Sequence, residues 1–147
     1  AWQTAGHIGR ALALVPVGHD GLREINFGQV NGQTLESFRA TMPEIYARWQ
    51  DRGDFTFQWP GGEQRLAFFQ RVSQAVSEII ARHPGEQVVI VAHGGSLRAA
   101  LAHLLPDTMS DWWGYVLVTA SLTHVRVAEA GNSLIALNDC QHLNEEP

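Results

Sequence analysis

The residues best placed to do chemistry are His93-Gly94-Gly95, which follow an apolar run and precede a predicted helix. The run, residues 88–92, is β-branched, which is typical of a buried parallel strand. Ligands of open α/β sheets bind beyond the carboxyl ends of strands, and a helix N-terminus there favours an anion such as phosphate. Glycines let the anion approach closely. We therefore expect His93 to contact a bound anion and stabilise developing charge; the alternative is that it caps a core strand.

Glu24 is the second candidate, in a polar segment that follows a predicted turn at residues 18–21. It is flanked by the apolar residues Leu22 and Ile25. A carboxyl group in a partly apolar cleft can act as a general acid. The alternative is a solvated loop residue, or one paired with Arg23.

A third segment, Trp59 to Glu63, joins an aromatic loop to the start of a helix. Glu63 is favourable beside the positive end of that helix. Trp59, with Phe55 and Phe57, would shape a pocket for a partly apolar ligand. Core packing of the same aromatic rings is the alternative.

Metal and cofactor chemistry find little support in the sequence. The polar stretch Asn138 to His142 has no matching second cluster, and a metal site needs three or four ligands. We therefore expect no metal and no cofactor. The single cysteine, Cys140, excludes an internal disulfide and is typical of a reducing compartment, which predicts a cytoplasmic location.

Length and charge narrow the function classes further. A chain of 147 residues is typical of one domain. The net charge is −5 without a basic stripe, so nucleic acid is not an expected partner. No apolar run approaches the roughly 20 residues that a membrane span needs.

Hydrophobic periodicity predicts the elements that position these residues. We expect helices at residues 1–14, 35–49, 63–83 and from 96 to before Pro106. The helical region 35–49 is expected in two pieces, with Pro43 opening the second. We expect strands at 88–92, 122–127 and 134–137, the last two joined by a turn at 129–132. Trp2, Ala5 and Ile8 already stand at helical spacing. The chain is therefore expected to begin inside a helix, as a fragment or with upstream residues unrecorded.

Taken in order, the motifs resemble those of the histidine phosphatase superfamily, also called the phosphoglycerate mutase-like family, through nearly the whole chain. Ala1–Ala5 is similar to the family motif Arg-Ala-x-Gln-Thr-Ala and begins one residue after the arginine of that motif. Leu22–Gly28 is similar to Leu-Arg-Glu-x-x-Phe-Gly, and Pro60–Glu63 to Pro-Gly-Gly-Glu-Ser, in which Gln64 replaces the serine. Val91–Arg98 is similar to the second-histidine motif, and Leu137–Leu143 to the C-terminal ending.

The resemblance implies an α/β fold with three layers, α/β/α, a mostly parallel sheet and a C-terminal edge hairpin. Residues 1–147 would form one histidine phosphatase-like domain, N-terminally truncated and lacking the family's first strand. Without that first strand, the strand that ends at His93 would have an unpaired edge. Because unpaired strand edges promote aggregation, we expect the isolated chain to be marginally stable.

The resemblance also implies phosphomonoester hydrolysis through a phosphohistidine. His93 would be the second histidine of the phosphate pocket, Glu24 the proton donor to the leaving oxygen and Gly94 a backbone contact of the phosphate, with Arg23 and Trp59 contacting substrate. The nucleophile of the family lies in an Arg-His-Gly motif that this chain lacks, and Arg82–Gly85 is no substitute because it ends a helix. The full-length parent would thus be a phosphatase, whereas the chain as given lacks the nucleophile.

The expected partner is a small-molecule phosphate ester. Whether the protein also forms a homodimer is left open by the sequence. The short span from Glu24 to Pro60 resembles the compact α-ribazole phosphatase-like and broad-specificity phosphatases more than the cofactor-dependent mutases. Alternatives are a non-catalytic homologue that binds phosphorylated ligands, a phosphoglycerate mutase-like phosphotransferase and an inert α/β domain. A serine hydrolase is disfavoured because Gly94–Arg98 lacks the last glycine of Gly-x-Ser-x-Gly.

Overall fold

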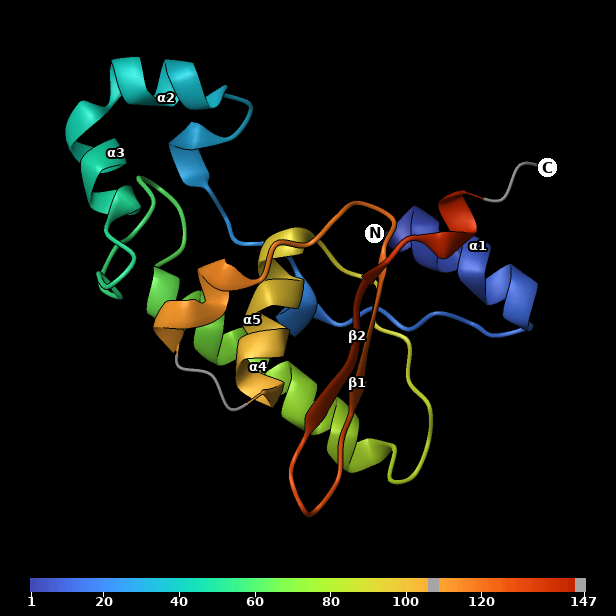
Figure 1. Cartoon of the computed structure of the whole chain (residues 1–147). Helices are drawn as coiled ribbons and strands as arrows, with labels where there is room; N and C mark the ends of the chain where they lie inside the picture. Colours follow the sequence, from blue (N-terminus) through green and yellow to red (C-terminus); the bar gives the residue numbers. More distant parts are fainter. Residues whose placement is uncertain (106–108, 145–147) are drawn as a thin grey trace. The chain divides into compact units, whose positions relative to one another are not determined.

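The computed structural model describes residues 1–105 and 109–144, in two compact units formed by residues 1–96 and 97–147. Figure 1 shows the course of the chain. The α-helices are α1 (Trp2–Leu12), α2 (Leu35–Thr41), α3 (Pro43–Gln50), α4 (Arg65–Arg82) and α5 (Gly94–Leu104). The strands are β1 (Leu122–Arg126) and β2 (Ser133–Asp139). The short 3₁₀ helices are η1 (Asp20–Leu22), η2 (Gly28–Val30), η3 (Met109–Gly114) and η4 (Gln141–Leu143). The first three residues of α5 belong to the first unit.

The break between α2 and α3 follows from local chemistry. The Thr34 hydroxyl oxygen accepts a hydrogen bond from the Ser37 amide at 3.1 Å and caps α2. Met42 ends α2, and Pro43 opens α3, where its missing N–H costs nothing. The two short helices lie next to each other (Figure 1), which confirms the pair expected from the sequence.

An aromatic cluster forms the core beside α2 and α3. The ring of Phe38 lies 5.4 Å from Tyr46, 6.1 Å from Trp49 and 5.6 Å from Trp59, measured between ring centroids. Phe57 packs edge-on against Trp59 at 5.1 Å. Tilted and edge-to-face rings at these distances are the favoured arrangement of aromatic side chains.

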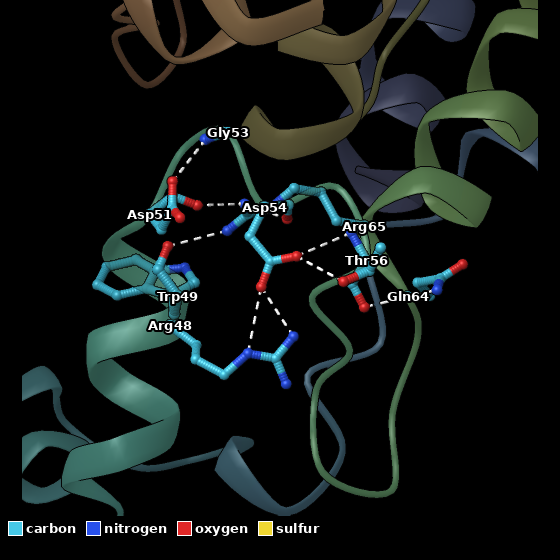
Figure 2. A network of polar contacts seen from close by, with 8 residues as sticks. All are labelled: Arg48, Trp49, Asp51, Gly53, Asp54, Thr56, Gln64 and Arg65. Atoms are coloured by element: carbon cyan, nitrogen blue, oxygen red, sulfur yellow. Dashed lines mark hydrogen bonds and ion pairs between the residues drawn. The ribbon is translucent and has the colours of Figure 1, made fainter.

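Arg65, only 3% exposed, fastens the loop after α3 to the start of α4 (Figure 2). Its guanidinium donates to the carbonyls of Asp51 and Asp54, both at 2.7 Å, and of Trp49 at 2.9 Å. The guanidinium also lies 5.1 Å from the centroid of the Phe57 ring. Burial lowers the pKa of Arg65 below its ordinary value, and the three carbonyl acceptors offset part of the cost of removing this cation from water.

A second polar group within this loop surrounds Asp54. Its carboxylate accepts hydrogen bonds from the Thr56 hydroxyl at 2.6 Å and from Arg48 Nη2 at 2.8 Å (Figure 2). These donors, first the Thr56 hydroxyl and then Arg48, hold the pKa of Asp54 below its ordinary value of 3.8. The loop therefore carries its own hydrogen-bonded turn.

Helix α4 buries one apolar face, formed by Phe68, Val72, Ala75 and Val76. It begins at Arg65 rather than at Glu63, because Gln64 has an extended backbone and the Glu63 amide donates to the Asn26 carbonyl at 2.9 Å. The chain leading into α4 is thus held by a contact distant in sequence, which helical periodicity does not report.

The expected strand at residues 88–92 belongs to no sheet within the described part of the chain. Val88 and Val89 are 45% and 59% exposed. A strand is defined by its ladder of hydrogen bonds to a neighbour, and no described residue supplies that ladder. The mostly parallel sheet is therefore not confirmed, and the sheet that residues 1–105 and 109–144 do form is two-stranded and antiparallel.

The second unit contains the expected C-terminal hairpin. β1 and β2 pair antiparallel, with Leu122 opposite Asp139 and Arg126 opposite Ser133. Gly131 adopts a φ of 119° in the connecting turn, which favours glycine. No helix in the described ranges is long and apolar enough to cross a membrane.

Candidate active site

Three segments of the first unit meet at the residues singled out from the sequence. They are residues 21–28, residues 59–63 and residues 94–96 at the start of α5, and together we call them the loop junction. Every polar contact described for the loop junction lies within residues 1–96.

Glu24 is half-buried and bridges two of these segments. Its Oε2 accepts a hydrogen bond from the Gly95 amide at 2.8 Å, and its Oε1 accepts from the Ile25 amide at 2.9 Å. The first amides of a helix have no acceptor within the helix and lie at the positive end of its dipole. A carboxylate is therefore a favourable partner for the Gly95 amide. The anion that the structure places at the start of α5 is the side chain of Glu24, and the bound phosphate expected there stays a prediction.

The two glycines at the start of α5 differ in their surroundings. A Cβ on Gly95 would overlap Glu24 Oε1, whereas a Cβ on Gly94 would meet nothing within 4 Å. The absence of a side chain at Gly95 is therefore what allows the Glu24 carboxylate to reach the backbone. Gly94 keeps an open approach to the same helix end.

Glu63 and Arg71 connect residues 21–28 to residues 59–63. Arg71 donates from Nε and Nη2 to the two carboxylate oxygens of Glu63 at 2.8 and 2.7 Å, which is a bidentate ion pair. Its Nη1 donates to the carbonyls of Gly21 at 3.0 Å and Arg23 at 2.8 Å. Arg71 thus holds the segment before Glu24 against the segment that opens α4.

Backbone groups of the two loops also approach closely. The Gln29 amide donates to the Pro60 carbonyl at 2.8 Å, and Gly28 adopts a φ of +55°. A Cβ on Gly28 would overlap the Pro60 carbonyl oxygen, and one on Gly62 would overlap the Asn26 carbonyl oxygen. These glycines are needed because two backbone segments occupy the space of a side chain.

His93 and Gly94 are exposed at the start of α5, two and one residues before Gly95. No hydrogen bond of the His93 side chain is found within the described ranges, so its ring is open to a ligand. The structure thus brings Glu24 to the His93-Gly94-Gly95 turn, which the sequence places about 70 residues away.

The remaining two expected site residues are placed differently. The side chain of Arg23 is exposed, while its carbonyl is held in the loop junction. Trp59 is 5% exposed and packs against Phe27 at 5.0 Å as well as in the aromatic cluster. Its burial among neighbouring rings is what core packing predicts, and a contact of Trp59 with substrate stays a prediction.

Sequence reasoning missed Arg71 and Ser96 and gave Glu63 only a dipole role. The Ser96 hydroxyl donates to the Arg23 carbonyl at 3.0 Å from a fully buried position. Arg71 and Ser96 both donate to the Arg23 carbonyl, which lies 48 and 73 residues away from them in the sequence. No local sequence pattern reveals contacts of that separation. Among the residues described, no three His, Cys, Asp or Glu side chains gather as metal ligands. Next to the start of α5 the arrangement offers the Glu24 carboxyl group, the exposed imidazole of His93 and the backbone amides of the helix start, while the Glu63 carboxyl group is paired with Arg71.

Comparisons with known proteins point to one family. The sequence model of the histidine phosphatase superfamily (branch 1) matches residues 1–140. Phosphoserine phosphatase 1 of Hydrogenobacter thermophilus is 30% identical over 142 residues, which cover 97% of this chain and 67% of that protein. Glucosyl-3-phosphoglycerate phosphatase of Mycobacterium tuberculosis is 32% identical over 120 residues, or 76% of this chain and 53% of that protein.

Among solved structures, YhfR of Bacillus stearothermophilus superposes with a TM-score of 0.85 at 25% identity. The match covers 98% of this chain and 71% of that one. This chain therefore spans between about half and just over two thirds of the relatives named here.

Proposed function

Because the chain belongs to the histidine phosphatase superfamily, we propose that it forms the acid and second-histidine part of a phosphomonoesterase site. The observation that carries this proposal is the 2.8 Å hydrogen bond between the Gly95 amide and Glu24 Oε2. It joins a carboxyl group to the turn that carries His93 and Gly94. An acid beside a helix start and an open imidazole is suited to transfer of a phosphoryl group.

In the proposed reaction, an imidazole nitrogen attacks phosphorus while the bond from phosphorus to the ester oxygen breaks. The leaving oxygen takes its proton from Glu24. The resulting carboxylate then accepts a proton from water as the water oxygen attacks phosphorus. The phosphorus–nitrogen bond breaks, and orthophosphate leaves. His93 and the Gly94 amide stabilise the charge on the phosphoryl oxygens, and the exposed Arg23 contacts the substrate.

We place the attacking imidazole outside these 147 residues, because they contain no Arg-His-Gly. The first test is therefore to read the gene upstream of the codon for Ala1. An in-frame Arg-His-Gly codon series supports the proposal. A stop codon directly upstream removes the phosphohistidine route. It would favour the second candidate, a homologue that binds phosphorylated ligands without turnover.

The second test measures the dependence of hydrolysis on the leaving group in the encoded protein. Phosphoserine and glucosyl-3-phosphoglycerate have poor leaving groups, and p-nitrophenyl phosphate has a good one. We expect Glu24→Gln to lower kcat/KM for the poor leaving groups about 100-fold, the usual size of a lost general acid, and for p-nitrophenyl phosphate less than about tenfold.

Glu44→Gln is the matched control, because Glu44 is exposed on α3. It should leave both rates unchanged. Equal slowing of all esters by Glu24→Gln would contradict the acid role.

A further inference from the structure

The carbonyl oxygen of Arg23, directly before Glu24, is held from two sides. The Ser96 hydroxyl donates to it at 3.0 Å from the first turn of α5, and Arg71 Nη1 donates to it at 2.8 Å from α4. A peptide unit is planar and includes the Cα atom of the next residue, so holding this oxygen from two sides restrains the Cα atom of Glu24. The backbone at Glu24 is thereby fixed by two side chains from two helices.

Each of the two donors is itself restrained. Ser96 is fully buried, which leaves its hydroxyl little freedom to turn to another acceptor. Arg71 is locked by its bidentate pair with Glu63, and its guanidinium lies 5.0 Å from the centroid of the Phe68 ring. Donors that are themselves held in a fixed geometry are what a precisely held functional group requires.

Ser96 also stands next to Gly95, whose amide binds the Glu24 carboxylate. The same turn of α5 therefore contacts Glu24 twice, at the carboxylate and at the peptide that precedes it. We propose that Ser96, assisted by Arg71, is a positioning residue that sets the Glu24 carboxyl group beside the start of α5. This inference rests on the proposed function for its catalytic consequence, but its geometry can be tested without catalysis.

The test of geometry is amide hydrogen exchange at Gly95, followed by NMR on the 147-residue chain. The Gly95 amide has no acceptor within α5, so its protection reports the bond to Glu24. We expect Ser96→Ala to accelerate its exchange about fivefold, the effect of one ordinary hydrogen bond. Residues Ala99 and Ala100, further along α5, should exchange as before.

Ser73→Ala is the matched control. The Ser73 hydroxyl is buried without a hydrogen-bond partner within the described ranges, so this variant removes the same atom from α4 but breaks no hydrogen bond. Unchanged Gly95 exchange in Ser96→Ala, or equal acceleration in both variants, would overturn the inference. Equal acceleration at Ala99 and Ala100 would also overturn it, because Ser96 would then only stabilise α5.

The test of consequence uses the leaving-group series in the encoded protein. We expect Ser96→Ala to lower kcat for phosphoserine about tenfold, with KM and the rate on p-nitrophenyl phosphate changed less than about twofold. A role in stability alone would lower both rates together and would count against positioning. If Glu24→Gln itself leaves the leaving-group dependence unchanged, the proposed function fails, whereas the exchange result at Gly95 still decides the geometry.

Discussion

Two parts of the first unit differ in how their backbone and side chains are engaged. In the loop junction, carbonyls and amides from three segments bind one another or the side chains of Glu24, Glu63 and Arg71. Residues 14–17 and 88–92 are apolar yet lie outside any helix or strand. Val17 is 90% exposed.

The difference shows that the site geometry and the expected sheet are separable. The loop junction closes with contacts among residues 21–96 alone, so Glu24 reaches Gly95 although residues 88–92 pair with no described strand. Residues 88–92 have the composition of a buried strand, and residues 14–17 are a short apolar run, but neither run pairs with a strand among the residues that the structure describes. Substitutions should therefore be costly in the loop junction and in the α4 core and cheap in these two runs.

The largest effect is expected where the two loops of the junction touch. Gly28→Ala should destabilise the chain by about 3 kcal/mol, because it adds a left-handed backbone penalty to an overlap with the Pro60 carbonyl. Gly32→Ala is the matched control, since Gly32 has a φ of +77° but open space around it, and should cost about 1 kcal/mol. Urea unfolding followed by circular dichroism measures both. Equal costs would show that the loops separate without penalty.

A pair of valine truncations compares the α4 core with the exposed run. Val72 is fully buried on α4, and Val72→Ala should lower the free energy of unfolding by about 2 kcal/mol. Val17→Ala should change it by less than about 0.5 kcal/mol because the side chain is already in water. The same urea titration tests both. A similar loss in both variants would mean that residues 14–17 are packed in solution.

The ion pair of the junction should be worth more than a pair on the surface. A double-mutant cycle on Arg71 and Glu63, which are 27% and 20% exposed, should give a coupling energy of about 1 to 2 kcal/mol. The pair of Arg82 and Glu78, 71% and 39% exposed at 4.0 Å, should give less than about 0.5 kcal/mol. Coupling energies of the same size would remove the distinction between junction and surface.

The smallest effect concerns pH and the loop after α3. The lowered pKa of Asp54 means that its carboxylate stabilises the loop above pH 3.8, and this contribution is lost as the pH falls through the folded-state pKa. NMR titration of the Asp54 carboxyl carbon should give a midpoint below 3.8. Thr56→Val should move that midpoint upward, since the Thr56 hydroxyl is the main cause. A midpoint at or above 3.8 in the unmodified chain would contradict the hydrogen-bonded turn.

Much of the helical structure could be predicted because its determinants are local. Thr34 and Pro43 mark the two helix starts, and the apolar period marks α4. The burial of Arg65 could also have been predicted, because it stands at helical spacing with the buried residues Phe68 and Val72 and so belongs to the same face of α4.

The rest depends on contacts that a local pattern does not contain. The run at 88–92 predicts a strand by composition, but pairing needs a neighbour that the described residues do not provide. The meeting of Glu24 with the His93 turn was expected only through resemblance to a family. Arg71 and Ser96 look like ordinary helix positions until their distant acceptor at Arg23 is known.

The wide sequence separation at the Arg23 carbonyl has a consequence for how the chain folds. Bringing Ser96 to Arg23 across 73 residues costs loop-closure entropy of about 4 kcal/mol if it occurs in one step. Once Arg71 has closed the shorter span of 48 residues, only roughly 25 residues remain to be closed, and the first part of them is already ordered in α4. Loop-closure entropy therefore favours an order of assembly in which α4 docks first and Glu24 meets the start of α5 last.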